Sequence, residues 1–205
     1  MIEKIELGHR IFKTKVSDKL VEKINNKIDT QIEHEKTISA VSTLSGKIKS
    51  EYKSNWIHGM DEENGKELIN TVCYALDNSY KDNAFNIAMI KKNEAWINDQ
   101  RKNEYQIIHT HSGESTIGFT SILFLKVPDF GPEYTNTVGP TNGKTEIIGN
   151  IAGQFIENTY TVEPAVGDFY VFPYDLRHIV YPFTSDGLRR SMSINYDVFF
   201  EKRHL

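Results

Sequence analysis

Two histidines stand one residue apart in the stretch "IIHTHSG" at residues 107–113, although the whole chain has only seven histidines. In an extended strand, side chains at positions i and i+2 point to the same face, roughly 6–7 Å apart along the backbone. His109 and His111 are therefore placed to converge on one object, while Thr110 points away from it. A metal ion and water are the two candidates for that object.

A third histidine, His178, lies in "GDFYVFPYDLRHIVYPF" at residues 167–183, where a turn at "PYDLR" leads into the next apolar run. Any one of these histidines, taken alone, is more often an ordinary hydrogen-bonded side chain than a metal ligand. Together, two ligands from one strand and one from a distant strand give the facial arrangement of open iron sites. Such a site leaves three of six octahedral positions for substrate and oxygen.

An arginine and a serine follow the third histidine in "GLRRSMSINYDV" at residues 187–198. In a strand, Arg189 and Ser191 share one face, and Arg190 lies on the other. If the first face looks into a barrel, the Arg189 guanidinium can hold a carboxylate through two hydrogen bonds, and the Ser191 hydroxyl adds a donor. Arg190 is the rival for this role, and a salt bridge with a structural hydroxyl is the simpler alternative.

The elements that must position these residues are mainly strands. From about residue 85, eight short aromatic and β-branched runs are separated by Gly, Pro, Asn and Asp, which predicts an antiparallel sandwich or barrel. Before them, apolar residues recur every fourth position over 17–36 and 64–80, which predicts two amphipathic helices packed outside the barrel. We expect one domain over 1–205, with a mainly helical part at 1–84 and a barrel core at 85–200.

The helical pattern also predicts the environment of the single cysteine and the residue at which the first helix begins. Cys73 widens the apolar stripe of the second helix, so we expect a buried core thiol rather than a nucleophile. Ser17 precedes the first helix as an expected N-cap.

Composition excludes several classes of protein. Lys plus Arg is 24 and Asp plus Glu is 28, so the formal charge is −4, which argues against a nucleic-acid binder that works by general phosphate attraction. One cysteine allows no internal disulfide, which fits a reducing compartment. The start "MIEKIELGHRIF" is not a secretory signal, and no stretch approaches the roughly 20 apolar residues of a membrane span. We therefore expect a cytoplasmic protein without membrane or nucleic-acid partners, and pairing into a homodimer stays open.

The order H-x-H/D, a long gap, G-D-x-x-x-F-P-x-x-x-x-H and then R-x-S resembles the Fe(II)- and 2-oxoglutarate-dependent oxygenases. The matching stretches lie at 95–128 and 167–195, and they look most like the prolyl-hydroxylase-related branch common in phage and marine bacteria. The resemblance implies a double-stranded β-helix, also called a cupin-like jelly roll, with flanking helices. It also implies Fe(II), 2-oxoglutarate and O₂ as cofactor and cosubstrates.

The family's site residues carry over one by one onto this sequence. His109 matches the first metal histidine and His178 the distal one. Arg189 and Ser191 match the pair that holds the distal carboxylate of 2-oxoglutarate, and Tyr105 lies where such enzymes often place a further hydroxyl. The implied reaction converts 2-oxoglutarate to succinate and CO₂ and hydroxylates a C–H bond of a substrate that the sequence does not identify.

His111 departs from the family pattern, which has Asp or Glu at this position. A neutral imidazole leaves the metal site more positive than a carboxylate would. Three interpretations follow: His111 itself ligates the metal, Glu114 swings in as the carboxylate, or the site binds iron poorly and is vestigial. We favour ligation by His111, because its spacing from His109 already has the right direction and Glu114 falls on a turn.

Two other functions compete with the oxygenase hypothesis. A three-histidine cupin-like metalloenzyme that needs no 2-oxoglutarate would explain His111, but it leaves Arg189 and Ser191 without a role. A non-enzymatic jelly-roll binding module would need no metal. For the enzyme, a small molecule or a peptidyl group is the expected substrate, selected by loops such as 127–144, where Phe130 and Tyr134 offer stacking surfaces.

Overall fold

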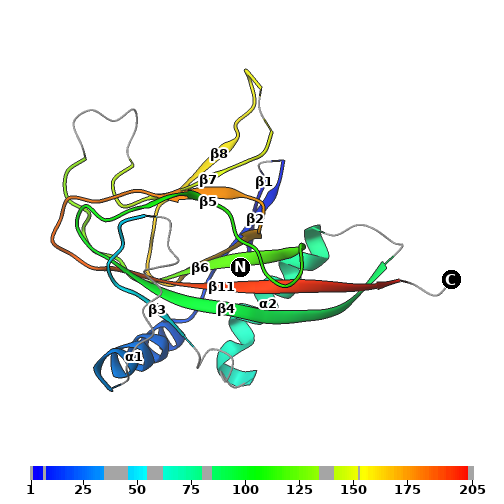
Figure 1. Ribbon diagram of the computed structural model, residues 1–205, viewed down its shortest axis with the longest axis horizontal. Coiled ribbons are helices and arrows are strands. Elements are labelled where there is room, and N and C mark those ends of the chain that lie inside the picture. Colours follow the sequence, from blue (N-terminus) through cyan, green and yellow to red (C-terminus); the bar gives the residue numbers. More distant parts are fainter. Residues whose placement is uncertain are drawn as a thin grey trace.

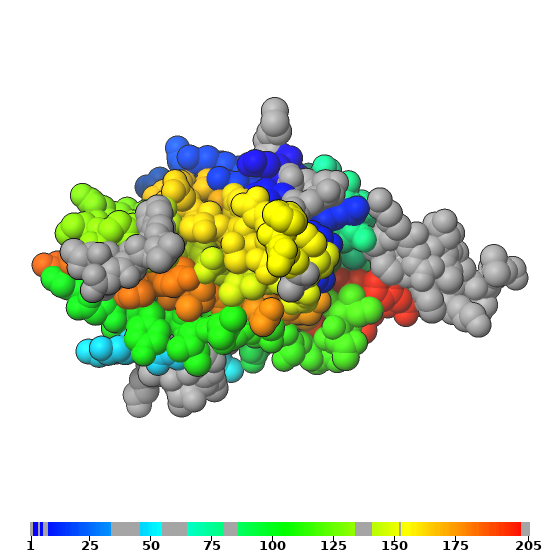
Figure 2. Space-filling view, turned by 90° about the horizontal axis from the view of Figure 1, so that it is seen from above, coloured from blue at the N-terminus to red at the C-terminus, as the bar shows by residue number. Residues whose placement is uncertain are grey.

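The computed structural model describes residues 2–6, 8–34, 46–54, 62–79, 85–133, 141–151 and 153–202. Within these ranges the chain forms two antiparallel sheets, with a smaller sheet over one face of a larger sheet and two helices against the other face (Figure 1). Seen from above, segments of the smaller sheet cover the middle of the molecule (Figure 2). This arrangement is a double-stranded β-helix with helices packed outside, as the sequence predicts.

All eight runs expected beyond residue 85 form strands. They are β4 (Phe85–Gln100), β5 (Gln106–His109), β6 (Gly118–Lys126), β7 (Thr145–Ile148), β8 (Thr159–Val162), β9 (Asp168–Pro173), β10 (Arg177–Val180) and β11 (Arg189–Lys202). The first 84 residues contribute β1 (Glu3–Glu6), β2 (Arg10–Lys15) and β3 (Glu51–Lys53) in addition to two helices. These three strands are absent from the sequence prediction of a mainly helical segment.

The order of the strands explains how the interior is enclosed. The larger sheet runs β1-β2-β9-β6-β11-β4-β3, and the smaller runs β5-β10-β7-β8. From β4 onward the chain passes back and forth between the two sheets, apart from β7 and β8, which pair with each other in the smaller sheet. The N-terminal strands extend the larger sheet at both edges.

The helices α1 (Asp18–His34) and α2 (Glu62–Ser79) bury their apolar stripes against the outer face of the larger sheet. The buried residues recur at the expected four-residue spacing and are Leu20, Ile24 and Ile28 of α1 with Leu68, Val72 and Leu76 of α2. No helix among the described residues is long and apolar enough to cross a membrane.

Two details of the helices differ from expectation. Cys73 is exposed rather than buried, because the buried stripe of α2 centres on Val72 and Leu76 and residue 73 lies beyond its edge. Ser17 stands at the N-cap position of α1, where its carbonyl oxygen accepts the Val21 N–H at 3.1 Å, but its hydroxyl donates to Glu67 of α2 at 2.6 Å. That bond ties the start of α1 to α2.

Strand β11 separates polar from apolar residues by its two-residue period. Its outer face supplies buried apolar residues to the helix-covered core, namely Met192, Ile194, Tyr196 and Val198. Its inner face, toward the smaller sheet, carries the buried polar residues Arg189, Ser191, Ser193, Asn195 and Asp197. Strand β11 thus presents polar side chains to the interior and apolar ones to the helices, whereas β2, β6 and β9 face the smaller sheet with a buried apolar cluster that includes Ile11, Phe124 and Phe172.

The two adjacent arginines consequently have different environments. Arg190 points outward, where its Nε and Nη2 donate to the two carboxylate oxygens of Asp99 at 2.6 and 2.7 Å. Its Nη1 donates to Asp29 of α1 at 2.6 Å. Arg190 therefore fastens α1 to the sheet and is fully occupied by carboxylates, so it is not available to bind an acid inside the barrel.

Replacing Asp99 with Asn should lower the free energy of unfolding by about 2–4 kcal/mol, because the buried Arg190 guanidinium loses its bidentate partner and keeps only the half-exposed Asp29. Urea denaturation measures this change. The matched control is Asp186→Asn, which removes an exposed partner of Lys102 and should leave stability close to wild type. Equal stability of the two variants would contradict the structural role of Arg190.

Candidate active site

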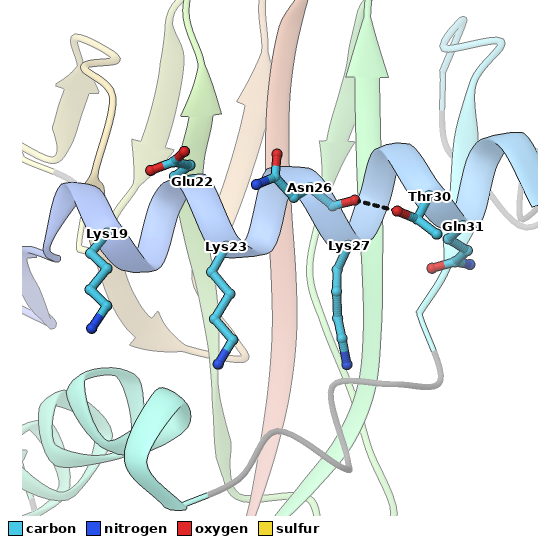
Figure 3. A pocket seen from close by; sticks show the side chains of 7 residues that line it. All are labelled: Lys19, Glu22, Lys23, Asn26, Lys27, Thr30 and Gln31. Carbon is cyan, nitrogen blue, oxygen red and sulfur yellow. Dashed lines mark hydrogen bonds between the residues drawn. The ribbon is translucent and has the colours of Figure 1, made fainter.

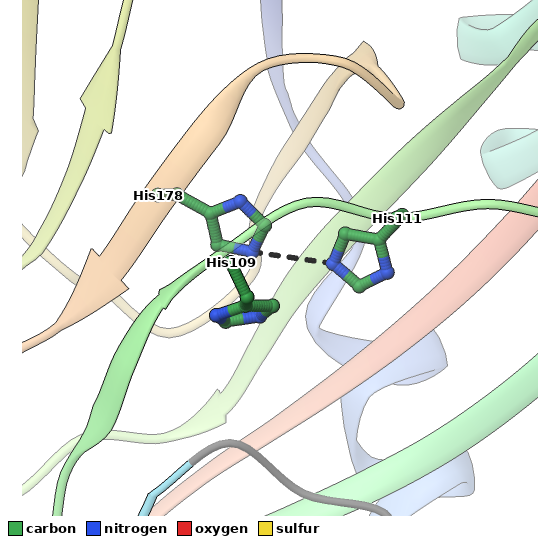
Figure 4. A group of neighbouring side chains, drawn as sticks. All are labelled: His109, His111 and His178. Carbon is green, nitrogen blue, oxygen red and sulfur yellow. Dashed lines mark hydrogen bonds between the residues drawn. The ribbon is translucent and has the colours of Figure 1, made fainter.

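Three histidines meet in the interior: His109 at the end of β5, His111 in the segment after β5, and His178 in β10. One ring nitrogen from each of His109, His111 and His178 lies within 4.8 Å of the other two. The Nε2 atoms of His111 and His178 are 3.2 Å apart (Figure 4). A cation with nitrogen ligands at about 2 Å holds them roughly 3–4 Å apart, so this set is close to metal-binding geometry.

The pairing of β10 with β5 brings the distant histidines together. His178 lies directly opposite His109, whereas Val180 lies opposite Gln106. Three residue steps on β5 therefore match two on β10, which is a β-bulge at residues 107–108, and both isoleucines there are exposed. The bulge sets the direction in which His109 leaves the strand.

Backbone carbonyls orient two of the rings. His109 Nδ1 lies 2.7 Å from the Ile107 carbonyl oxygen, and His178 Nδ1 lies 3.3 Å from that of Leu176. Each Nδ1 donates its proton there, so the lone pair of Nε2 points into the cluster. Burial lowers the pKa of all three histidines, that of His111 to about 3 with His109 nearby adding to the shift. All three rings are thus neutral near pH 7 and able to ligate a cation.

A buried carboxylate and a tyrosine hold the segment that carries His111. The His111 N–H donates to the Tyr174 carbonyl at 3.0 Å, and the Tyr174 hydroxyl donates to Asp197 at 3.1 Å. Asp197 also accepts the Glu114 N–H at 3.1 Å. A Cβ on Gly113 would lie 1.9 Å from Asp197 Oδ1, so the segment sits as close to this carboxylate as a chain can. His111 is thereby fixed from both sides.

Glu114, the alternative ligand from the sequence, faces away from this cluster. Its carboxylate pairs with Lys91 at 2.6 Å and is exposed. Among the described residues, the candidate metal-binding group contains the three histidines and no carboxylate.

Arg189 is buried in the same interior without an acid to neutralise it. Its side chain is 2% exposed, and no carboxylate pairs with it in the part of the chain that the structure describes. Nη1 donates to Gln100 of β4 at 2.9 Å and Nη2 to Thr145 of β7 at 2.8 Å, whereas Nε has no partner among the described residues. The guanidinium stacks 4.9 Å from the Phe124 ring. Burial lowers the pKa of Arg189 to about 9, which reflects a positive charge that lacks a counter-ion.

One pocket between the sheets contains the histidines and Arg189. Ser191 lines this pocket as expected. The full set of lining residues is Trp96, Asn98, Gln106, His109, His111, Ile122, His178, Val180, Arg189, Ser191 and Ser193.

Tyr105 does not line this pocket, contrary to the role that the family resemblance implies. Its side chain is 38% exposed, and the residue that turns inward at this level is Gln106. The two are neighbours at the start of β5, where successive side chains point to opposite faces. A shift of one residue at the start of β5 would turn Tyr105 inward in place of Gln106, and the sequence alone does not reveal this register.

Strand β4 supplies pocket residues that the sequence analysis missed. Trp96 stacks on His111 with ring centroids 5.4 Å apart, Asn98 lines the wall, and Gln100 accepts from Arg189. These three residues alternate in "EAWINDQ" at 94–100. The same two-residue reasoning that selects Arg189 and Ser191 would have found them. Thr145 on β7 has no comparable signal.

A second hollow runs along α1 on the opposite side of the larger sheet, lined by Lys19, Glu22, Lys23, Asn26, Lys27, Thr30 and Gln31 (Figure 3). Its side chains are those of a solvated helix face, and it contains none of the histidines. The chemistry therefore belongs to the pocket between the sheets, where three neutral imidazoles and one uncompensated guanidinium can hold a cation together with an organic acid.

Comparison with known proteins agrees with this site. Residues 94–195 match the protein family described as "Putative 2OG-Fe(II) oxygenase". The matched region runs from within β4 to within β11 and includes the three histidines and Arg189. No curated protein sequence matches the chain.

Solved structures with the same fold extend over nearly the whole chain. A Pseudomonas putida prolyl-4-hydroxylase is 12% identical with a TM-score of 0.58, covering 95% of this chain and 94% of that one. The viral collagen prolyl hydroxylase of Paramecium bursaria Chlorella virus-1, in a 2-oxoglutarate complex, is 13% identical with a TM-score of 0.57, covering 91% and 94%. SnoN, a non-heme α-ketoglutarate-dependent epimerase of nogalamycin biosynthesis, is 12% identical with a TM-score of 0.63, covering 91% and 77%.

The family match falls on the strands that carry the three histidines and the buried arginine, and the fold is the one that these oxygenases share. The chain belongs to the 2-oxoglutarate- and Fe(II)-dependent oxygenases.

Proposed function

We propose that the protein is an Fe(II)- and 2-oxoglutarate-dependent oxygenase that hydroxylates a small-molecule or peptidyl substrate and releases succinate and CO₂. His109, His111 and His178 would hold the iron. Arg189 and Ser191 would hold the distal carboxylate of 2-oxoglutarate. The prolyl hydroxylases among the similar structures support hydroxylation as the outcome.

The observation that carries this proposal is the buried, acid-free guanidinium of Arg189. A buried charge without a partner is costly, and a carboxylate is the ligand that relieves it best. Gln100 and Thr145 occupy two of its nitrogens and fix its plane, while Nε remains unpaired. A vestigial metal site would have no reason to retain this charge.

The protein around the proposed metal has two tasks, performed by backbone carbonyls and by apolar side chains. When bound, iron and 2-oxoglutarate supply the oxidising chemistry, which the protein itself does not perform. The carbonyls of Ile107 and Leu176 keep protons on the Nδ1 atoms of His109 and His178 and so keep the Nε2 lone pairs available. The apolar residues Ile122 and Val180 line the pocket and limit the access of water.

Three neutral ligands also affect the choice of cosubstrate. A site with an imidazole in place of the usual carboxylate is more positive by one charge, which favours a chelating dianion such as 2-oxoglutarate. A three-histidine enzyme without 2-oxoglutarate would share the metal site but would leave Arg189 unpaired. We therefore place the 2-oxoglutarate-dependent reaction first.

The direct test mixes the protein anaerobically with Fe(II) and 2-oxoglutarate and follows the weak visible charge-transfer band of the chelate. We expect the band, together with turnover of 2-oxoglutarate in air. In Arg189→Met the band should require about 100-fold more 2-oxoglutarate, because a buried charge pair is lost. Arg177→Met, on the exposed side of β10, is the matched control and should titrate like wild type. Absence of both band and turnover in wild type would reject the proposal.

Removing candidate ligands should identify the third metal ligand. His111→Ala should weaken Fe(II) binding by more than about 100-fold, since changes outside the ligand set alone cost about 10–100-fold. Glu114→Ala should leave binding unchanged, because that carboxylate is exposed and paired with Lys91. Anaerobic titration with Fe(II) measures both variants. The reverse pattern would make Glu114 the ligand and His111 its neighbour.

Asp197 should act as a positioning residue for His111. Asp197→Asn weakens the hold on the Tyr174 hydroxyl and on the backbone of the His111 segment, so we expect Fe(II) affinity to fall by about tenfold. The apparent affinity for 2-oxoglutarate at saturating iron should change little. Asp175→Asn, on the exposed turn before β10, serves as the control. Equal losses of iron and 2-oxoglutarate affinity would indicate general unfolding instead of positioning.

A further inference from the structure

A buried carboxyl that no proposed step uses lies next to the pocket. Glu51 of β3 is 2% exposed and pairs directly with Asn98 of β4, so the two side chains leave the sheet on the same face. Its neighbour Tyr52 packs against the outer, helix-covered core. Glu51 therefore faces the interior, on the same side as the pocket wall.

Each member of this pair has one buried oxygen that lacks a donor. Glu51 Oε2 and Asn98 Oδ1 are buried and accept no hydrogen bond from the residues that the structure describes. Lys53, two residues along β3, does not supply the missing donor, because its ammonium pairs with the exposed Glu94 at 3.3 Å. Burial raises the pKa of Glu51 to about 8, with Lys53 opposing the shift. Unpaired buried acceptors are rare in folded proteins and usually mark a place for a ligand or ordered water.

The pair adjoins the proposed reaction site on the side away from Arg189. Asn98 lines the pocket together with the three histidines, and it also lies opposite Ser191 of β11. The segment that leads into β3 crosses to the smaller sheet, where Gly46 pairs with Gln106, another pocket residue. Across the larger sheet, Arg189 on β11 can therefore donate to an acid, and the neighbouring strands β4 and β3 carry the acceptors Asn98 and Glu51.

We propose that Glu51 and Asn98 form a subsite for the substrate to be oxidised, and that this subsite takes a protonated nitrogen group, an ammonium or a guanidinium. The inference rests on the proposed function, in which Arg189 already binds 2-oxoglutarate. A cationic donor would satisfy both acceptors and stabilise Glu51 in its ionised form, whereas a second carboxylate would bring no donor for either oxygen. The acidic cosubstrate would thus bind at Arg189 on β11, and the cationic substrate would bind at Asn98 and Glu51 on β4 and β3.

The binding test uses pairs of amino acids that differ in side-chain charge. Calorimetric titration is done anaerobically on protein loaded with Fe(II) and 2-oxoglutarate, with L-arginine against L-citrulline and L-lysine against L-norleucine. We expect the cationic member of at least one pair to bind about tenfold or more tightly than its neutral counterpart, and Glu51→Gln to abolish the difference. Glu94→Gln, which removes an exposed carboxylate from the neighbouring strand, should preserve it.

Equal affinities within both pairs, or no binding of either cation, would overturn the subsite. The charge-transfer band distinguishes this result from a failure of the proposed function, because Glu51→Gln should form the band as wild type does. Absence of the band in wild type would count against the function, and the stability readout below would still test Glu51.

That second readout needs no ligand. Because the folded-state pKa of Glu51 lies above its usual value of 4.5, the carboxyl contributes most stability below pH 4.5 and loses it as the pH rises through about 8. Glu51→Gln should therefore raise the melting temperature, by more at pH 9 than at pH 5. A lower melting temperature at pH 9 would show that the carboxylate has a structural partner, and this too would overturn the proposal.

Discussion

Strand β11 turns its polar residues inward and its apolar residues toward the helices, and the arrangement of the site depends on this division. Strand β11 places Met192 and Ile194 against α1 and α2, while Arg189 and Asp197 point between the sheets. Burying polar groups is unfavourable unless each finds a partner. Several do so within the protein, but Arg189 Nε stays unpaired. The polar part of the interior thus keeps a place for a ligand beside the apolar cluster that β2, β6 and β9 form with the smaller sheet.

The histidine cluster depends on the backbone as much as on the rings. Carbonyl oxygens set the protonation of His109 and His178, and a carbonyl of the turn before β10 holds the N–H of His111. Tyr174 provides that carbonyl and also binds Asp197 through its hydroxyl. One residue therefore joins the turn that precedes His178 to the segment that carries His111. The spacing of the candidate ligands is a property of these main-chain contacts, which explains why a three-histidine set can keep its shape without a carboxylate.

Much of this arrangement is predictable from the sequence, because period-two alternation is a local property. It places Arg189 and Ser191 on one face, and it gives His109 and His111 a shared direction. The fold class, the strands beyond residue 85 and the two helical stripes are confirmed. Other features depend on pairing between distant residues. The inward turn of Gln106 in place of Tyr105 depends on a start point and a bulge, and the exposure of Cys73 depends on how far α2 is rotated against the sheet.

The contact between Gly46 and the start of β5 makes the metal geometry sensitive to a residue more than sixty positions away in sequence. A Cβ at residue 46 would lie 2.3 Å from the Tyr105 carbonyl oxygen and 2.7 Å from the Gln106 Cα, so any side chain there must push this strand outward. Only two residues, Ile107 and Ile108, separate Gln106 from His109, and the backbone between them already accommodates an extra residue. A methyl group at residue 46 would therefore displace the start of β5 and, with it, the imidazole of His109. The geometry of the metal site thus depends on the close packing of Gly46 against β5.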